Sequence, residues 1–290
     1  MTEEPAPAAS PPLVGEWVRA CGLQRADALA LLRACAGISH AALLAHPEAP
    51  LPDSCAARLR QAAQRVRAGE PLAYVLGWKE FYGLRLQVGP QVLVPRPETE
   101  LLVEFALQHL RPRQPAEVLD LGTGSGAVAI AVAAQRAHAR VHASDRSAEA
   151  LRLAQDNAAR LLPAARPGGP LQWHLGDWMQ ALPEQAGPFD LLLSNPPYVA
   201  ADDPHLAALR FEPALALVGA RRSADGLAEI RALLVQAVPR LRAGGWLALE
   251  HGWNQAAAVR ALLRDAGLRQ VHSLRDLAGI PRVGAARAAP

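Results

Sequence analysis

The chain contains a four-residue stretch whose side chains and carbonyl groups could hold a planar NH2 group: Asn195, Pro196, Pro197 and Tyr198. The side-chain oxygen of Asn195 and the carbonyl of Pro196 could each accept one N–H bond of such a group. A proline carbonyl points in a preset direction, because the ring fixes φ and removes the N–H. The Tyr198 ring could stack on the planar group and face a sulfonium, a contact worth roughly 0.5–2 kcal/mol. The pattern indicates methyl transfer to a planar nitrogen.

Such a nitrogen is a poor nucleophile because its lone pair is delocalised; in a peptide amide the rotation barrier is ~18–20 kcal/mol. A site that grips both N–H bonds helps the nitrogen become tetrahedral, and no base needs to act before attack. Positioning and preorganised electrostatics would then be the main contributions. We expect Asn195, Pro196 and Tyr198 to be catalytic, with Pro197 joining them in substrate binding. The alternative is a turn that merely ends a strand, since Asn and Pro are common in turns.

A glycine-rich turn follows an apolar run in the sequence VLDLGTGSGAVAIAVA. Gly122, Gly124 and Gly126 would let the backbone turn sharply and let a ligand come close. Asp145 ends the next expected strand, where an acid can accept hydrogen bonds from both ribose hydroxyls. The spacing is G-x-G-x-G rather than the dinucleotide pattern G-x-G-x-x-G, and Asp120 could pair with the ammonium of a methionine. The pattern favours S-adenosylmethionine over a dinucleotide, and a turn without a ligand is the remaining alternative.

The sequence Gly-Asp-Trp follows the third expected strand and adds two residues to this site. Asp177 could bond the adenine edge of the cofactor, and Trp178 could cover its face. The reaction would leave S-adenosylhomocysteine, and we expect no metal in it.

Short apolar strands alternate with amphipathic helices after Pro115, which predicts a parallel sheet covered on both faces. The expected strands are 118–121, 140–144, 171–174, 190–194, 246–250 and 269–274. The expected helices are 127–135, 148–161, 227–241 and 255–266. Ligands of such sheets bind at the carboxyl ends of the strands. We therefore expect Asn195 to emerge at the same rim as Gly124 and Asp145.

The first part of the chain has a different texture. A proline-rich, acidic start predicts a disordered tail, and a helical pattern then runs to about Ala68 with no strand-like alternation. Aromatic and β-branched residues broken by glycines next predict a hairpin-like connector. The expected organisation is a tail at 1–12, a helical substrate-recognition domain at 13–73, a hairpin linker at 74–95 and the α/β domain at 96–290.

Composition sets limits on where the protein acts and on what. The 290 residues carry a formal net charge of +3, a weak signal for nucleic acid, and we do not expect nucleic acid as the substrate. Cys21, Cys35 and Cys55 have neither metal-ligand nor redox spacing, which is typical of a reducing compartment. The N-terminus lacks the features of a secretion signal, and the longest apolar run, 127–134, is too short to cross a bilayer. We expect a cytoplasmic protein with no membrane partner.

These motifs together resemble the class I S-adenosylmethionine-dependent methyltransferases of the Asn-Pro-Pro-Tyr group, which have a Rossmann-like fold. The group includes adenine-N6 DNA and RNA methyltransferases and protein-glutamine methyltransferases, and the motif alone does not choose between them. The segment 71–103 does choose, because its EFYG (Glu80–Gly83) and PRPETE (Pro95–Glu100) resemble the linker of the peptide chain release factor glutamine methyltransferases. The match continues through GDW, FEPALAL, LRAGGWLALEHG and DLAGIPRV, and covers about residues 70–284.

The resemblance implies a fold, a reaction and a set of site residues. The fold is an α/β Rossmann-like methyltransferase domain preceded by a small all-helical domain. The reaction transfers a methyl group to the side-chain N5 of the glutamine in the Gly-Gly-Gln motif of class I peptide chain release factors. The cofactor site would comprise Gly122, Thr123, Gly124, Ser125, Gly126, Asp145, Trp178 and Asn195, besides the Asp120 and Asp177 considered above. The substrate amide would be held by Asn195, Pro196, Pro197 and Tyr198.

Other residues of the matching segments have less definite places. Arg96, Glu98 and Thr99 would lie near the site entrance, and Glu250 ends the expected strand 246–250 at the same rim. The chain departs from the family pattern in ALVGARRSADGL, where Val218 replaces an expected polar residue and two arginines follow, and in its alanine-rich end.

Three alternatives to this function have different expectations. An adenine-N6 nucleic-acid methyltransferase should display a basic face and a means of holding a flipped base. A degenerate methyltransferase fold acting as a scaffold should have lost motif residues, yet all are present. A dinucleotide oxidoreductase is disfavoured by the glycine spacing.

Overall fold

The computed structural model describes residues 12–290, so all but one residue of the expected tail lies outside the described part. The chain divides into two compact units, Met1–Gly77 and Trp78–Pro290. This boundary falls within the expected linker at 74–95, and it assigns the hairpin to the second unit.

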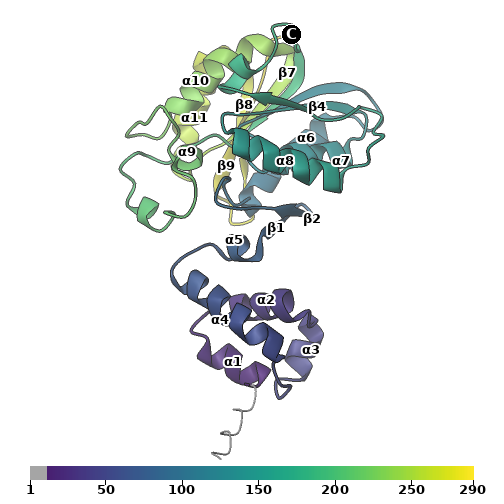
Figure 1. The fold of residues 1–290 in the computed structure, drawn as a ribbon. Helices are drawn as coiled ribbons and strands as arrows, with labels where there is room; N and C mark the ends of the chain where they lie inside the picture. Colours follow the sequence, from purple (N-terminus) through teal and green to yellow (C-terminus); the bar gives the residue numbers. More distant parts are fainter. Residues whose placement is uncertain (1–11) are drawn as a thin grey trace, which may run out of the picture. The chain divides into compact units, whose positions relative to one another are not determined.

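The first unit is helical within its described residues (Figure 1). Its helices are α1 (Val14–Ala20), α2 (Arg25–Ala36), α3 (His40–Ala45), α4 (Asp53–Arg67) and α5 (Leu72–Leu76). Fully buried leucines of α2 and α4, Leu32 and Leu59, meet in its core. The helix α2 ends where Gly37 adopts a left-handed conformation, the usual way for glycine to stop a helix.

A tight antiparallel hairpin opens the second unit, with β1 (Trp78–Phe81) paired to β2 (Leu84–Gln87). Tyr82 and Gly83 both have positive φ, 49° and 72°, as a two-residue hairpin turn of type I′ requires. Phe81 and Leu86 are buried in the same hydrophobic cluster as the central sheet, so the hairpin packs as part of this unit.

A seven-stranded sheet forms the centre of the second unit, with strand order β5-β4-β3-β6-β7-β9-β8. Its strands are β3 (Ala116–Leu121), β4 (Ala139–Asp145), β5 (Gln172–Leu175), β6 (Phe189–Ser194), β7 (Leu241–Glu250), β8 (Arg269–Arg275) and β9 (Pro281–Arg287). The first five are parallel to one another, whereas β9 is antiparallel to both β7 and β8.

The predicted parallel sheet is therefore interrupted at β9, an antiparallel strand that was not among the expected strands. This strand contains one β-branched residue, Val283, among alanine, glycine, proline and arginine, so it lacks the run of β-branched residues that identifies strands in a sequence. Small residues are needed there because α11 packs closely: a Cβ at Gly284 would lie 2.8 Å from a methyl group of Val259.

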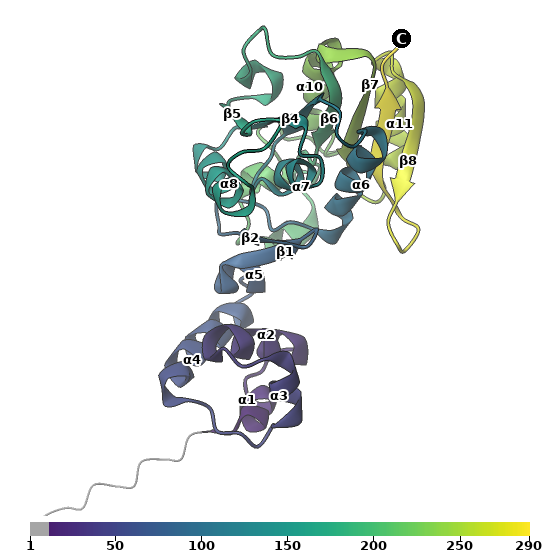
Figure 2. The ribbon, with the colours of Figure 1, turned by 90° about the vertical axis from the view of Figure 1, so that its right-hand side faces the viewer.

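Helices cover both faces of the sheet, as predicted. One face carries α6 (Glu100–His109), α7 (Ala127–Gln135) and α8 (Ala148–Leu161), which Figure 2 shows side by side. The other face carries η2 (Trp178–Ala181), α10 (Ala228–Ala237) and α11 (Ala256–Asp265). Successive strand residues alternate between the two cores, so that Val118 joins the first cluster and Leu119 the second.

Shorter elements complete the unit: η1 (Pro97–Thr99), η3 (Pro204–Ala207), α9 (Ala214–Leu217) and η4 (Val238–Arg240). Within residues 12–290, no helix has both the length and the apolar character that crossing a membrane demands.

Asn157 of α8 connects the hairpin to the glycine turn. Its side chain is fully buried, and Nδ2 donates to the carbonyls of Gln87 and Ser125, each at 3.0 Å. Its Oδ1 accepts from the Gln87 amide at 2.7 Å. One carboxamide thus completes backbone hydrogen bonds in two segments that are distant in the sequence.

We predict that Asn157→Ala lowers the free energy of unfolding of the second unit by about 2–3 kcal/mol, because it leaves the buried Ser125 carbonyl and the partly buried backbone groups of Gln87 without partners. Denaturant titration followed by tryptophan fluorescence measures this, since five of the six tryptophans lie in that unit. Asn254→Ala, at an exposed position, is the control and should leave the midpoint unchanged. Equal midpoints for the two variants would contradict the proposed connection.

Candidate active site

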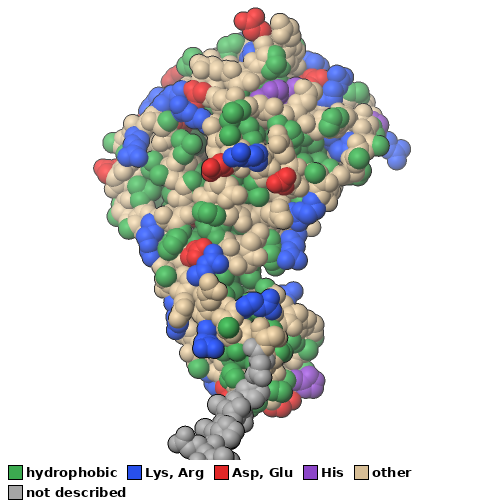
Figure 3. Space-filling model, viewed as in Figure 1, with side chains coloured by type: hydrophobic (Ala, Val, Ile, Leu, Met, Phe, Trp, Pro, Cys, Tyr) green, Lys and Arg blue, Asp and Glu red, His purple; other side chains and the backbone are tan. Residues whose placement is uncertain are grey.

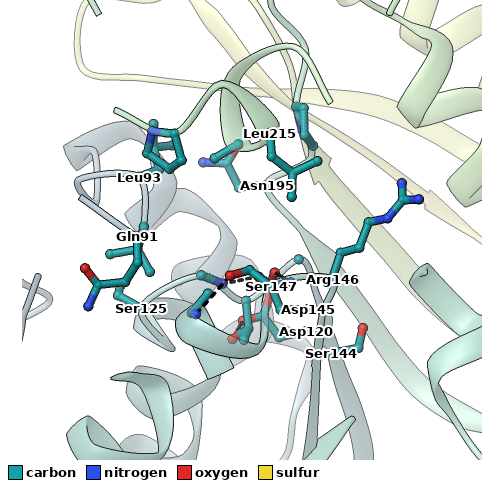
Figure 4. A pocket seen from close by; sticks show the side chains of 18 of the residues that line it. Gln91, Leu93, Asp120, Ser125, Ser144, Asp145, Arg146, Ser147, Asn195 and Leu215 are labelled. Atoms are coloured by element: carbon teal, nitrogen blue, oxygen red, sulfur yellow. Dashed lines mark hydrogen bonds between the residues drawn. The ribbon is translucent and has the colours of Figure 1, made fainter. Parts of the chain in front are cut away.

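A single cavity at the carboxyl ends of the strands brings together most of the residues that the sequence singled out (Figure 4). Those that line it are Asp120, Gly122, Thr123, Gly124, Ser125, Asp145, Asp177, Trp178, Asn195 and Pro197. Gly126, Pro196 and Tyr198 belong to the same segments but are not among its lining residues. In the view of Figure 4, Asn195 and Leu215 lie above the cavity, and Asp120, Asp145 and Ser147 lie below it.

The register of the sheet explains this convergence. Leu121 of β3 is aligned with Ser144 of β4 and with Ser194 of β6, so these strands end within one residue of one another. The residues that follow are Gly122, Asp145 and Asn195. Three side chains or turns far apart in the sequence thus emerge side by side.

Asp145 holds the glycine turn in place. Its Oδ2 accepts a hydrogen bond from the Gly124 amide at 2.8 Å, and its Oδ1 accepts from the Ser147 amide at 2.9 Å. Gly124 has a φ of +55°, and no atom lies within 4 Å of the position a Cβ would take, so the turn presents bare backbone to the cavity. Gly126 has a packing role instead, because a Cβ there would lie 2.7 Å from Ile130.

Asp120 lies beneath the glycine turn and is almost fully buried. Its Oδ2 accepts from the Thr123 hydroxyl at 2.7 Å and from the Ala129 amide at 3.2 Å. Burial raises the pKa of Asp120 to about 6, against the opposing effect of the Thr123 hydrogen bond. A buried carboxylate at the cavity wall favours a cationic ligand group beside it.

Asp177 is paired with two arginines. The Arg221 guanidinium donates to both carboxylate oxygens of Asp177, and Arg146 lies 3.8 Å away. The hydrogen bonds from Arg221 lower the pKa of Asp177 below its ordinary value. Arg221 belongs to the segment that departs from the family pattern, and its partner could not be predicted from sequence.

Glu229 of α10 is a buried acid that the sequence analysis missed, and it organises the wall around Trp178. It accepts from the amides of Ala220 and Arg221 at 2.8 and 2.9 Å, and from the Arg221 guanidinium at 2.8 Å. It also accepts from the Trp178 indole at 3.2 Å. Trp178 has a left-handed φ of 48° and packs against Gly122. The indole is therefore held both by its hydrogen bond to Glu229 and by its contact with Gly122.

A chain of side-chain hydrogen bonds supports the Asn-Pro-Pro-Tyr segment. Asn195 Nδ2 donates to Thr99 Oγ1 at 3.1 Å, and that hydroxyl donates to Glu250 Oε2 at 2.6 Å. The Tyr198 hydroxyl donates to Glu250 Oε1 at 3.0 Å. Glu250 is only 2% exposed, and burial raises its pKa to about 7. Thr99 thus lies at the site itself, rather than only near its entrance.

A second ion pair connects the PRPETE segment to the long loop after β6. Arg96 Nη2 lies 2.5 Å from Glu212 Oε1, and the same carboxylate accepts from the Val94 amide at 3.0 Å. Glu212 is buried although it lies in a segment with little regular structure. Pro95 and Pro213, the chain neighbours of this pair, line the cavity.

Comparisons with known proteins identify the family. The Methyltransferase small domain model matches residues 98–211, and the PrmC N-terminal domain model matches residues 19–77. The release factor glutamine methyltransferase of Bordetella pertussis is 50% identical over 90% of this chain and 94% of that protein. That of Burkholderia pseudomallei is 46% identical over 96% of this chain and 97% of that protein.

The chain belongs to the release factor glutamine methyltransferase family. A methyltransferase structure from Pyrococcus furiosus has the same fold, with a TM-score of 0.52 at 20% identity over 80% of this chain and 98% of that chain. The predictions of a Rossmann-like methyltransferase domain, of this family and of S-adenosylmethionine as cofactor are confirmed.

The cavity of this member of the family has chemical groups that suit S-adenosylmethionine. Asp120 places a carboxylate at the cavity wall that could pair with the ammonium, Gly124 has open backbone, and Asp145 lies at the strand end where ribose hydroxyls are bound in such folds. Across residues 12–290, no group of three or more His, Cys, Asp or Glu side chains is placed to hold a metal ion.

We predict that the affinity for S-adenosylmethionine is constant between about pH 6.5 and 7.5 and weakens roughly tenfold per pH unit below about 6. The reason is that Asp120 is ionised above its raised pKa, and a protonated Asp120 cannot pair with the ammonium. Calorimetric titration at a series of pH values measures the dissociation constant. Asp120→Asn should bind weakly and show no bend near pH 6; an unchanged bend in that variant would assign the titration to another group.

We also predict that Arg221→Gln lowers the free energy of unfolding by about 1–3 kcal/mol, since it leaves Asp177 and the buried Glu229 without their shared cation. Arg222→Gln is the matched control, because Arg222 is the exposed next residue. Denaturant titration of both variants gives the difference. If the two lose the same amount, Arg221 has no special place in the site.

Proposed function

We propose that this protein transfers a methyl group from S-adenosylmethionine to the side-chain N5 of the glutamine in the Gly-Gly-Gln motif of class I peptide chain release factors. The observation that carries the proposal is that Asn195 and Pro197 line the same cavity as Asp120 and Gly124. A group able to hold a planar amide therefore lies in the same cavity as the groups suited to the methyl donor.

The chain's own residues would act by holding the amide. Asn195 Oδ1 and the Pro196 carbonyl accept the two N–H bonds, and the Tyr198 ring stacks on the amide plane, which Pro197 also borders. When bound, S-adenosylmethionine supplies an electrophilic methyl group on a sulfonium. Held by Asn195 and Pro196, the amide nitrogen would take this methyl group and lose its extra proton to water, and S-adenosylhomocysteine would be released. Orientation and fixed dipoles lower the barrier without a base acting first.

The remaining cofactor contacts follow from the cavity walls. We propose that Gly122, Thr123 and Ser125 bind along the amino acid part of the cofactor, and that Asp145 binds the ribose. Asp177 and Trp178 would border the adenine. Asp177 would do so while paired with Arg221, since an ionised carboxylate can accept more than two hydrogen bonds.

We propose that the helical residues 13–73 recognise the release factor, with 74–95 as the linker and 96–290 as the methyltransferase domain. The matching N-terminal family model at 19–77 and the nearly full-length similarity to release factor glutamine methyltransferases support this assignment. The substrate places the enzyme's activity in the cytoplasm, where release factors act.

The adenine-N6 alternative receives no support. Basic side chains are dispersed over the face drawn in Figure 3 and alternate with acidic and apolar ones, instead of forming a continuous basic field. A flipped base would need such a field beside the site to hold the nucleic acid backbone.

We predict that, with labelled S-adenosylmethionine, the protein labels an unmodified release factor and labels neither the same factor with its motif glutamine changed to alanine nor a mixed DNA and RNA pool. Asn195→Ala should lower the rate by about 10²–10³, the usual cost of losing one preorganised hydrogen-bonding group, while leaving the fold intact. Label counting and circular dichroism provide the two readouts. Label on nucleic acid with the release factor untouched would overturn the proposal.

A further inference from the structure

The buried carboxylate of Glu250 is hydrogen-bonded to Thr99 and Tyr198 but takes no direct part in the proposed methyl transfer. We propose that Thr99 and Glu250 are positioning residues that set the orientation of the Asn195 carboxamide, so that its oxygen and not its nitrogen faces the substrate. The inference rests on the proposed function and concerns the same site. It adds two residues to the reaction, neither of which touches the methyl group.

The three residues of this hydrogen-bonded chain come from separate parts of the fold. Thr99 ends η1, Asn195 follows β6, and Glu250 ends β7. Ser194 of β6 is aligned with Leu249 of β7, so the next residue on each strand emerges at the same level. The Thr99 hydroxyl lies between them, 3.1 Å from Asn195 Nδ2 and 2.6 Å from Glu250 Oε2, and both Thr99 and Glu250 are buried.

The direction of these hydrogen bonds follows from counting hydrogens. An ionised carboxylate carries none, so any hydroxyl bonded to it must donate. The single hydroxyl hydrogen of Thr99 is therefore committed to Glu250, and Thr99 Oγ1 can only accept from Asn195. Only the NH2 end of a carboxamide can donate, so Nδ2 must face Thr99 and Oδ1 must face away from it.

This orientation is the one that the substrate needs. A planar NH2 group presents two donors, and it must meet acceptors. If Asn195 were turned over, two NH2 groups would face each other, with no hydrogen bond and with mutual repulsion. An isolated Asn side chain has no strong preference between the two orientations, so the choice must come from its neighbours.

Glu250 also orients the tyrosine of the motif. The Tyr198 hydroxyl donates to Oε1 while Thr99 donates to Oε2, so each carboxylate oxygen fixes one part of the segment. Burying a carboxylate is costly. A glutamine at this position would be cheaper to bury, but it has one donor end and one acceptor end. Its NH2 could donate to Thr99, freeing the Thr99 hydrogen to donate to Asn195 Oδ1 and reversing the chain of bonds.

The charges around Glu250 leave its ionisation sensitive to pH. Glu98 of η1 raises its pKa further, and Arg282 of β9 lowers it. The hydrogen bonds from Thr99 and Tyr198 also favour the ionised form. Below its raised pKa, Glu250 carries a hydrogen of its own and can donate to Thr99, as a glutamine could.

The first test compares two substitutions at Thr99 in the full-length protein. Thr99→Ser keeps the hydroxyl and should stay within about threefold of the wild-type kcat, whereas Thr99→Val has the same shape without it and should lose about 10–100-fold. The dissociation constant for S-adenosylmethionine, measured by calorimetry, should be unchanged in both variants. Equal kcat values for the two variants would overturn the inference, and so would a Thr99→Val variant that loses cofactor affinity in parallel with kcat.

The second test uses Glu250→Gln at saturating cofactor. The wild-type kcat should fall as the pH decreases through about 7, where Glu250 becomes protonated. The variant should be slow throughout and lack this fall, while binding the cofactor normally. A variant with wild-type kcat, or with the same pH dependence, would show that Glu250 does not direct the orientation.

Failure of the inference and failure of the proposed function give different results. If the wild-type protein labels nucleic acid instead of the release factor, the proposed substrate is wrong. The exocyclic amine of adenine is also a planar NH2, so the Thr99 and Glu250 comparisons on that substrate would still decide whether the orientation is set in this way.

Discussion

The site depends on the alignment of four strand ends. Leu121, Ser144, Ser194 and Leu249 form one row across β3, β4, β6 and β7, so the next residues are Gly122, Asp145, Asn195 and Glu250. The first three line the cavity and the fourth supports it from behind. A shift of one residue in any of these strands would turn the emerging side chain to the other face of the sheet. The hydrophobic alternation that buries both faces of the sheet therefore determines which side chains emerge at the cavity.

Three carboxylates, of which Glu212 and Glu229 are buried and Asp145 is partly buried, then hold the loops that follow these strands. Asp145 holds the glycine turn, Glu229 holds the segment around Ala220 together with Trp178, and Glu212 holds the PRPETE segment. In each case the acceptor is satisfied by backbone amides or by arginine, which offsets the cost of removing the charge from water. Each acid belongs to one element and fixes another, so the walls of the cavity are set by a few long-range hydrogen bonds.

The sequence allowed much of the fold and site to be predicted, for a physical reason. Asp145 is the last residue of β4 and Asn195 directly follows β6, and α/β folds place such residues at one rim, so local signals sufficed. The helices α7 and α8 begin and end where the pattern predicted them. By contrast, β9 was missed because its small residues are required by the close packing of α11, and the local sequence does not reveal that contact. Glu229 was missed because an acid within a helix usually faces solvent, and only its neighbours in space show that it is buried.

The orientation of Asn195 limits what the motif can select. A chain of hydrogen bonds that presents an acceptor suits any planar NH2 group, whether it belongs to glutamine or to adenine, so it cannot distinguish these substrates. Selectivity must then come from the cavity walls and from surfaces beyond them. The walls of the cavity include Pro95, Pro197, Pro213 and Leu215. Prolines have fixed φ and no N–H to offer a base edge, so this lining suits the slender aliphatic stem of a glutamine better than a heterocycle that needs hydrogen bonds along its edge.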